Sequence, residues 1–370
     1  MARLNSSSRL GHYPGTSSSP AISNATDSGP NHAIWTTDEF GSAIDMGTLS
    51  GGGAKSLARL DPSTSRSVNP SENTAFTTSP ISYFIVGGGG GGANGNTAGA
   101  GGGGGGYATG SFSIGSSPVQ ITVGGGGLGV NPAVRDGNNG VWPGIPGIGQ
   151  GYDTVLGSII AYGGGRGAAG GGSAGNSSGP TEMQAGNSQA SGGGGARFNG
   201  TGGTSGPQGN DGGSTPGCPG YGSAGGGGAG SAGDDFACHP VSQAGLGGNG
   251  IQCPTPFRPY NYGARGPGGS TNYFCGGGGG SNWNATSVQH GGYGGGGGNI
   301  NDDNTSDPNI VGIQTVSGVP TSGGGGGGNG SGGNPYGPVV ISTGLHPDGE
   351  FELTSSRGGN GGPGIIMIKW

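Results

Sequence analysis

The sequence predicts a mainly irregular and all-β fold with almost no α-helix, in which glycine-rich rods pack side by side and short β-strands close the bundle. Three observations lead to this prediction. Glycine fills 105 of 370 positions and comes in unbroken runs, which form neither stable helices nor well-packed strands. The net charge is only −6, whereas disordered chains usually carry a high net charge. The apolar residues are grouped in short runs of β-branched and aromatic residues, which are typical of strands.

Residues 1–80 are expected to form a separate, extended N-terminal segment. They are rich in Ser, Thr, Asn and Pro, and a segment so poor in apolar residues cannot build its own core. We therefore expect it to lie against the glycine-rich body or a partner protein, with a flexible tail as the alternative. Thr36 or Thr37 is placed to cap one helical turn. The most apolar stretch contains Ile34, Trp35 and Phe40.

Strands are expected at both ends of the glycine-rich body, which spans residues 81–370. Residues 83–86 and 365–370 are predicted to pair and so close this unit. A further, less regular candidate strand covers residues 107–114. Clusters of β-branched and aromatic residues bounded by glycine or proline predict the remaining strands at residues 81–86, 119–123, 154–162, 339–341 and 364–370.

Glycine runs connect these strands and are predicted to form polyglycine II rods. A helix of this type has three residues per turn and no internal hydrogen bonds, and buried backbone groups need partners. Glycine helices must therefore pack laterally, and any side chain at the contact would hold the neighbours apart. Collagen is excluded because no Gly-X-Y period is sustained. The unbroken runs are residues 87–92, 101–106, 276–280, 294–298 and 323–328.

Composition and motifs argue against several classes of function. Lys and Arg number 12 against 18 Asp and Glu, which argues against binding of nucleic acid. No apolar stretch approaches the roughly 20 residues that span a bilayer. The many Gly-x-Gly-x-x-Gly matches lack the strand, helix and later acidic residue of a dinucleotide site. We therefore expect no enzyme activity, no cofactor and no membrane insertion.

Metal sites are not expected either. The cysteines contain no Cys-x-x-Cys pair, so buried thiols or disulfides are favoured over zinc, with three full pairings open. The acidic pairs at residues 234–235 and 302–303 offer the oxygen ligands that calcium prefers, but solvated turns are the favoured interpretation. The four cysteines are Cys218, Cys238, Cys253 and Cys275.

A binding surface is the function that the residues themselves predict best. Aromatic residues gather in short islands rich in Asn, Ser and Gly, which is the composition of antibody paratopes. Loops on a rigid scaffold often carry recognition. The alternative is that these aromatic side chains cover the flanks of the glycine rods. The candidate receptor-binding residues are Trp142, Tyr260, Tyr262, Tyr273, Phe274, Trp283 and Tyr336.

Several segments follow one another in an order that runs from an apolar strand through glycine blocks to a final apolar strand. They are residues 83–87, 106–110, 119–124, 157–165, 208–213 and 358–368. This order resembles the glycine-rich domain of tailed-phage fibre and virion proteins, those of cyanophages in particular. The architecture also resembles the tip adhesins of T-even-like long tail fibres, in which polyglycine II rods form a sandwich. The N-terminal segment does not match the fibre-docking region of those adhesins.

The resemblance implies a bacteriophage structural protein of the virion, a tail-fibre or adhesin subunit. Residues 1–80 would then attach to other virion proteins, through Ile34, Trp35 and Phe40, and loops would bind a host cell-surface glycan or outer-membrane protein. Fibre proteins are commonly homotrimers, so a homotrimer is expected. Two alternatives stay open: a capsid decoration or tail accessory protein without receptor binding, and a disordered glycine-rich matrix protein.

Overall fold

The computed structural model describes much of the glycine-rich body and three short pieces of the N-terminal segment. Small, mostly antiparallel sheets and irregular backbone make up the described residues, with short 3-10 helices at η6 (Thr255–Tyr260) and η7 (Pro267–Gly269). The predicted mainly irregular, β-containing class is therefore confirmed. No helix in this part of the chain is long and apolar enough to cross a membrane. The described residues are 32–37, 43–45, 66–68, 80–95, 98–112, 119–129, 149–170, 189–196, 199–216, 222–237, 243–260, 262–282, 290–298, 317–330, 344–346, 349–351 and 358–369.

A five-stranded sheet closes one end of the body, with the order β2-β1-β17-β4-β7. All of its pairs are antiparallel, and the register of β17 on β4 sets Ile365 opposite Val86. The predicted pairing of the first and last strands of the body is therefore confirmed. The strands are β1 (His32–Thr37), β2 (Ala43–Asp45), β4 (Ile81–Val86), β7 (Tyr107–Phe112) and β17 (Ile365–Lys369).

Strand β1 corrects the predicted helical turn at Thr36 or Thr37. Both residues belong to this strand, and Thr36 pairs with Ile365 of β17 on one side and Ile44 of β2 on the other. A helix cap would satisfy only local backbone groups, whereas pairing with a strand on each side satisfies more of the N–H and C=O groups of this segment. The N-terminal segment thus contributes strands to the body.

A four-stranded antiparallel sheet lies beside the first, with the order β10-β9-β8-β3. The single strand predicted at residues 154–162 is a hairpin, because Gly157 adopts a positive φ of 62° between β9 and β10. Glycine reaches this conformation without steric cost. The strand predicted at 339–341 lies outside the described residues. The members are β3 (Arg66–Val68), β8 (Val119–Thr122), β9 (Thr154–Leu156) and β10 (Ile159–Ala161).

The five-stranded sheet is apolar on both faces, which explains why β4 and β17 lack alternating polar residues. Successive side chains of a strand point to opposite faces. Ile85 of β4 and Ile366 and Ile368 of β17 pack in one cluster with Ile121 and Leu156 of the four-stranded sheet. The other face belongs to a second cluster, which contains Phe84, Val86, Cys253, Phe257, Tyr262, Phe274, Cys275, Ile365 and Met367.

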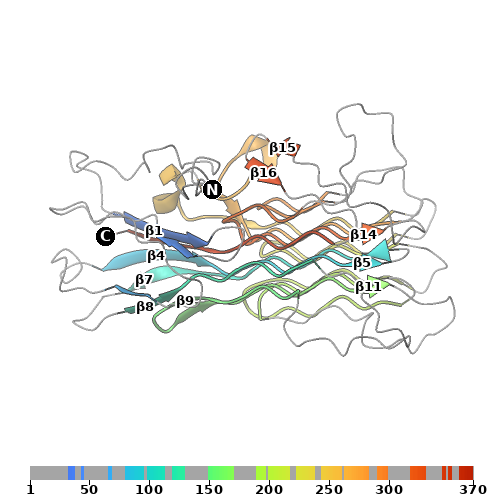
Figure 1. The fold of residues 1–370 in the computed structure, drawn as a ribbon, viewed down its shortest axis with the longest axis horizontal. Helices are drawn as coiled ribbons and strands as arrows, with labels where there is room; N and C mark the ends of the chain where they lie inside the picture. The colour runs from blue at the N-terminus through green and yellow to red at the C-terminus, as the bar shows by residue number, and fades with distance from the viewer. Residues whose placement is uncertain are drawn as a thin grey trace, which may run out of the picture.

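Glycine runs extend from these strands along the long axis of the molecule, toward small strands at the other end (Figure 1). The far strands β5 (Asn94–Gly95), β6 (Ala98–Gly99), β11 (Ala169–Gly170) and β14 (Asn329–Gly330) are two residues long. The remaining short pairs are β12 (Ile251–Gln252) with β13 (Tyr273–Phe274), and β15 (Gly344–His346) with β16 (Gly349–Phe351).

The buried run at residues 87–93 shows how the glycine segments are bonded. Each of its N–H groups donates to the carbonyl of a neighbouring run, and the same neighbours recur at every third residue. The neighbour's residue number falls as that of the run rises, so these neighbours are antiparallel. The bonds join Gly87, Gly90 and Ala93 to Gly106, Gly103 and Ala100, Gly88 and Gly91 to Tyr152 and Gly149, and Gly89 and Gly92 to Gly362 and Gly359.

The carbonyl groups of the same run bond to other neighbours, which run parallel to it. Gly164 and Gly167 donate to Gly88 and Gly91, again three residues apart. A Cβ added anywhere from Gly87 to Gly92 would overlap a backbone carbonyl of a neighbouring run. Residues 87–93 are all buried, so the close approach of these backbones requires that they carry little or no side chain.

Candidate binding surface

The predicted receptor-binding residues fall into different surroundings. Phe274 is fully buried and Tyr262 is 9% exposed, while Tyr273 is half-buried. Tyr260 ends helix η6. Phe274 and Tyr262 belong to the buried apolar cluster beside β4 and β17. The predicted residues Trp142, Trp283 and Tyr336, and Phe40 of the attachment set, lie outside the described residues.

The other two attachment candidates, Ile34 and Trp35, lie in β1. Their backbones pair with Met367 and Ile366 of β17. The strand that carries them is therefore part of the five-stranded sheet rather than a separate tail. This position places β1 and the edge strand β2 at one side of the body, beyond β17.

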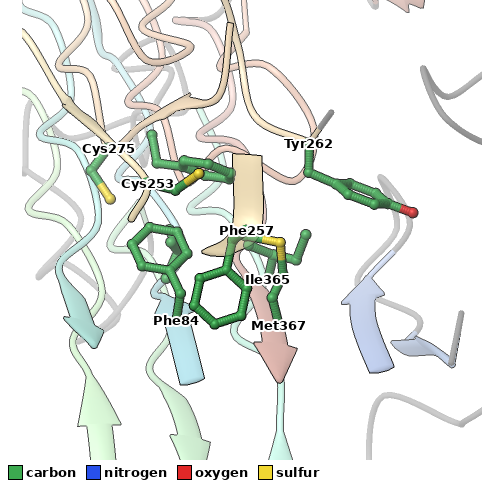
Figure 2. Close-up of a cluster of buried hydrophobic side chains, with 9 residues drawn as sticks. Phe84, Cys253, Phe257, Tyr262, Cys275, Ile365 and Met367 are labelled. Atoms are coloured by element: carbon green, nitrogen blue, oxygen red, sulfur yellow. The ribbon is translucent and has the colours of Figure 1, made fainter. Parts of the chain in front are cut away.

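An aromatic cluster packs under η6 and explains the burial of Phe274. The Phe84 ring lies 5.1 Å from that of Phe274, nearly edge-on at 67°, and 6.2 Å from that of Phe257. Edge-to-face pairs of this kind add about 0.5–1.5 kcal/mol beyond area burial. Figure 2 shows Phe84 and Phe257 facing one another beside Ile365 and Met367 of β17. These rings anchor the island at residues 250–275 to the sheet.

The same cluster holds the described cysteines as free thiols. Cys253 and Cys275 are both buried and unpaired. The backbone N–H of Cys253 donates to the carbonyl of Asn272, which places it opposite that residue rather than opposite Cys275. Desolvation by burial raises the pKa of the Cys253 thiol to about 11 and raises the pKa of Cys275 further. Cys218 and Cys238 lie outside the described residues.

A broad solvent-facing surface lies on the later glycine runs, and we call it the outer face. It consists of adjacent runs at residues 199–206, 209–216, 231–237, 243–250 and 290–294. Backbone hydrogen bonds join each run to the next, from Gly212 to Gly203, Gly233 to Asp211, Asp234 to Leu246 and Gly250 to Tyr293, at 2.7–3.0 Å.

Exposed side chains recur at every third residue in some runs of the outer face, whereas in the run 231–237 the exposed residues are Ala232, Asp234, Asp235 and Ala237. In the run 243–250 the exposed residues are Gln243, Leu246 and Asn249. Leu246 is 38% exposed, and on the adjacent run Tyr293 is 46% exposed. A three-residue period places these side chains along one side of the run. The same spacing relates Thr201 and Thr204, and also His290 and Tyr293.

Polar side chains on this face bond to backbone N–H groups. Asp211 Oδ1 accepts from the Ser205 N–H and Asp235 Oδ1 from the Ser214 N–H, each at 2.6 Å. Asn249 Oδ1 accepts from the Tyr293 N–H at 3.2 Å. These carboxylates therefore act as caps for backbone donors. No group of three or more His, Cys, Asp or Glu residues capable of holding a metal ion occurs in the described part of the chain.

A smaller exposed apolar pair lies on another part of the surface. Leu128 is 60% exposed and Tyr152 is 63% exposed, and their runs are bonded through the Tyr152 N–H and the Gly125 carbonyl at 2.9 Å. The Tyr152 ring lies over Gly125, where an added Cβ would meet only its Cδ2 atom, at 3.8 Å.

No protein-family model matches the chain, and no curated protein is similar to it in sequence. The site must therefore be interpreted from its own chemistry. Its described surface offers amide, hydroxyl, carboxylate and aromatic groups on closely bonded backbone, an arrangement suited to contact with another surface.

Sequence reasoning missed Leu246, His290 and the outer face as a whole. The available signal was the three-residue spacing of non-glycine residues within the later glycine-rich segments. That spacing is short and interrupted, so it is visible only once the runs are known to pack side by side.

Proposed function

We propose that the chain is a bacteriophage virion protein, a tail-fibre or adhesin subunit, whose glycine runs form a lateral bundle of polyglycine II helices. The observation that carries the proposal is the three-residue cycle of backbone hydrogen bonds along residues 87–93. A polyglycine II helix has three residues per turn and no internal bonds, so its N–H and C=O groups turn toward successive neighbours. Residues 81–370 supply this bundle.

The bundle serves as a stiff scaffold for recognition. At its buried glycines a Cβ would overlap a neighbouring backbone, and other buried residues of the runs are small, such as Ala100, Ala168 and Ser223, so larger side chains are confined to outward positions and connecting segments. Trp142, Trp283 and Tyr336, together with Tyr260 and Tyr273, contact a host cell-surface glycan or outer-membrane protein. Residues 1–80 attach the protein to the tail or another virion component, and the subunit assembles as a homotrimer on the particle surface.

Limited proteolysis tests the bundle. Closely bonded backbone resists cleavage because a protease must first open the segment, so residues 81–370 should survive as large fragments. Cuts should concentrate in connecting segments. Rapid digestion throughout the glycine runs would contradict both the bundle and the virion role, and would favour a disordered matrix protein.

Competition for adsorption tests the adhesin role. Purified protein added to host cells should occupy the receptor and reduce adsorption of phage particles that carry this protein. The double variant W142A/W283A should lose this effect, whereas Y152A, with an exposed aromatic outside the candidate set, should retain it. Immunogold labelling of the particles locates the protein. Labelling spread over the capsid, with no competition by the unsubstituted chain, would overturn the adhesin role in favour of decoration.

A further inference from the structure

The outer face combines open backbone groups with outward side chains. The N–H groups of Thr201, Ala232 and Leu246 donate to no other described residue, and the Gly247 carbonyl accepts from none. These positions differ from the buried run at 87–93, where each N–H has a partner in a neighbouring run. The outer face is thus the last layer of a packing pattern that continues through the interior.

Unpaired backbone at such a face can pair with another chain. The exposed edge of a β-sheet behaves in this way and recruits further strands unless side chains or other devices block it. Inside this protein, bare runs already associate through the same groups, as between Gly277 and Gly248 and between Gly292 and Gly277, at 2.7–2.8 Å. A second copy of this chain carries runs of the same kind and is therefore the nearest chemically matched occupant.

Side chains on the outer face prevent that contact. A Cβ at Gly248 would overlap the Ser231 carbonyl and one at Gly277 the Gly226 carbonyl, so at these positions, where a Cβ would point at the neighbouring carbonyl, there is no room for even a methyl group. Ala232, Asp234, Gln243 and Leu246 all project from neighbouring runs of the outer face and are exposed. Any approaching run would meet these groups before its N–H and C=O groups came within bonding distance.

We propose that the outward side chains of the outer face end the lateral growth of the glycine bundle, and that without them this face binds a second copy of the chain through backbone hydrogen bonds. The specificity is steric: presence of Cβ atoms, rather than charge or polarity, keeps the copies apart. This inference rests on the proposed bundle. It assigns to Leu246 and its neighbours a role that receptor binding does not require.

The test compares two variants of the full chain that differ only in methyl groups. The glycine variant is A232G/D234G/Q243G/L246G, and the alanine control is D234A/Q243A/L246A, which keeps a Cβ at all four positions. None of these side chains makes a hydrogen bond to another described residue in the protein. Both variants lose the same charge and the same large apolar group.

Sedimentation equilibrium measures the mass of each variant across a range of concentrations. The glycine variant should reach about twice the mass of the unsubstituted assembly, as expected for self-complementary pairing of one surface, while the alanine control keeps the unsubstituted mass. Equal masses for the three proteins, with unchanged circular dichroism, would overturn the inference. Equal association of both variants would also overturn it, because loss of charge or of side-chain bulk beyond Cβ would then suffice.

If the multiple glycine variant does not fold, a single substitution at Leu246 tests the same proposal. L246G should associate more strongly than L246A, and equal association constants would contradict the proposal. Failure of this inference is distinguishable from failure of the proposed function. A protease-resistant, monodisperse glycine variant refutes only the role of the outward side chains, whereas rapid digestion of the unsubstituted chain refutes the bundle itself.

Discussion

At the scale of single residues, glycine is required here because it has no Cβ, which lets neighbouring backbones approach closely. Most described glycines of the buried runs could not take a Cβ without overlapping a carbonyl of another run. Val in residues 101–106 or 323–328 is therefore expected to be far more damaging than Val in the islands. The island positions Gly268 and Gly269 are open but have φ of 65° and 80°, where Val would be strained. They are therefore poor controls.

Gly125 and Gly126 offer a better comparison, because they are adjacent in one run. A Cβ at Gly126 would overlap the Gly361 carbonyl, whereas one at Gly125 would meet only the Tyr152 ring at 3.8 Å. We expect Gly126→Ala to lower the free energy of unfolding by about 3 kcal/mol, since overpacking forces the backbone to shift. Gly125→Ala should be neutral or stabilise by about 0.4–1 kcal/mol through the unfolded state. Urea denaturation of both variants measures this, and equal destabilisation would contradict the steric account.

The buried thiols predict a loss of stability in alkaline solution. Desolvation raises the pKa of Cys253 from 9.0 to about 11 and that of Tyr262 from 10.0 to about 12. A raised folded pKa means that the unfolded state releases its protons first as the pH rises. The stabilisation that these protonated groups contribute is therefore complete below pH 9 and is lost as the pH rises toward 11 and 12.

Thermal melting at pH 8 and pH 10.5 measures this effect. The melting temperature should fall between these pH values, and the double variant C253A/C275A should show a smaller fall despite a lower starting stability. Both thiols should also react with a thiol reagent only after unfolding. A pH dependence unchanged by the double substitution would show that the thiols are not the cause.

At the scale of elements, the closing strands have a position that their sequences alone do not specify. The expected partners β4 and β17 do pair, but β17 also pairs with β1 of the N-terminal segment. Strand β3 likewise pairs with β8 in the second sheet. The division at residue 80 thus separates regions of different composition, whereas the described strands of both regions share their sheets.

Removal of residues 1–80 should therefore damage the body. The truncated chain would lose β1, β2 and β3, which leaves β17 as an edge with unpaired backbone groups, and such edges promote aggregation. We expect lower melting temperature and visible aggregation relative to the full chain, measured by light scattering during heating. Removal of residues 1–30 alone, which precede β1, serves as the control. Identical melting of the full chain and the 81–370 fragment would instead support an independent attachment segment.

At the scale of the whole molecule, stabilisation comes from two sources in different places. Apolar clusters on both faces of the five-stranded sheet bury Phe84, Ile85 and Ile366 completely. Beyond the sheets, the glycine runs bury backbone rather than apolar side chains and rely on bonds between runs. Because glycine loses the most conformational freedom on folding, this second source requires that nearly all interior N–H groups have partners.

The calorimetric signature of unfolding should reflect this division. Exposure of apolar surface raises the heat capacity and exposure of polar surface lowers it, with a typical net increase of about 12–15 cal/mol/K per residue. The heat-capacity increase per residue on unfolding of this chain should fall clearly below that range, because much of the newly exposed surface is peptide backbone. Differential scanning calorimetry over several pH values gives the quantity. A value within the usual range would mean that apolar burial dominates throughout the protein.

The extent to which the sequence predicts the structure differs between the strands and the candidate site. Strands at residues 81–86 and near the C-terminus were predictable because β-branched runs bounded by glycine are a local signal. The hairpin at residues 154–162 was not predicted, because Gly157 lies within an otherwise apolar run. The residues around Phe274 and Tyr262 in the sequence are typical of loops, so a loop position was predicted for both. The structure instead packs them against the second face of β4 and β17, and no local sequence pattern indicates this contact.

The sequence by itself determined where the backbone is bare, that strands lie at residues 81–86 and near the C-terminus, and that regular helices are scarce. Only the tertiary structure decided which runs are neighbours, such as Gly101 beside Ala224 and Gly102 beside Gly326. The reason is physical: a glycine run carries no side chains, so it presents nearly the same hydrogen-bonding surface to every other glycine run. Partner choice is therefore set by the lengths of the connections and by the apolar sheets at one end, and these act across the whole molecule.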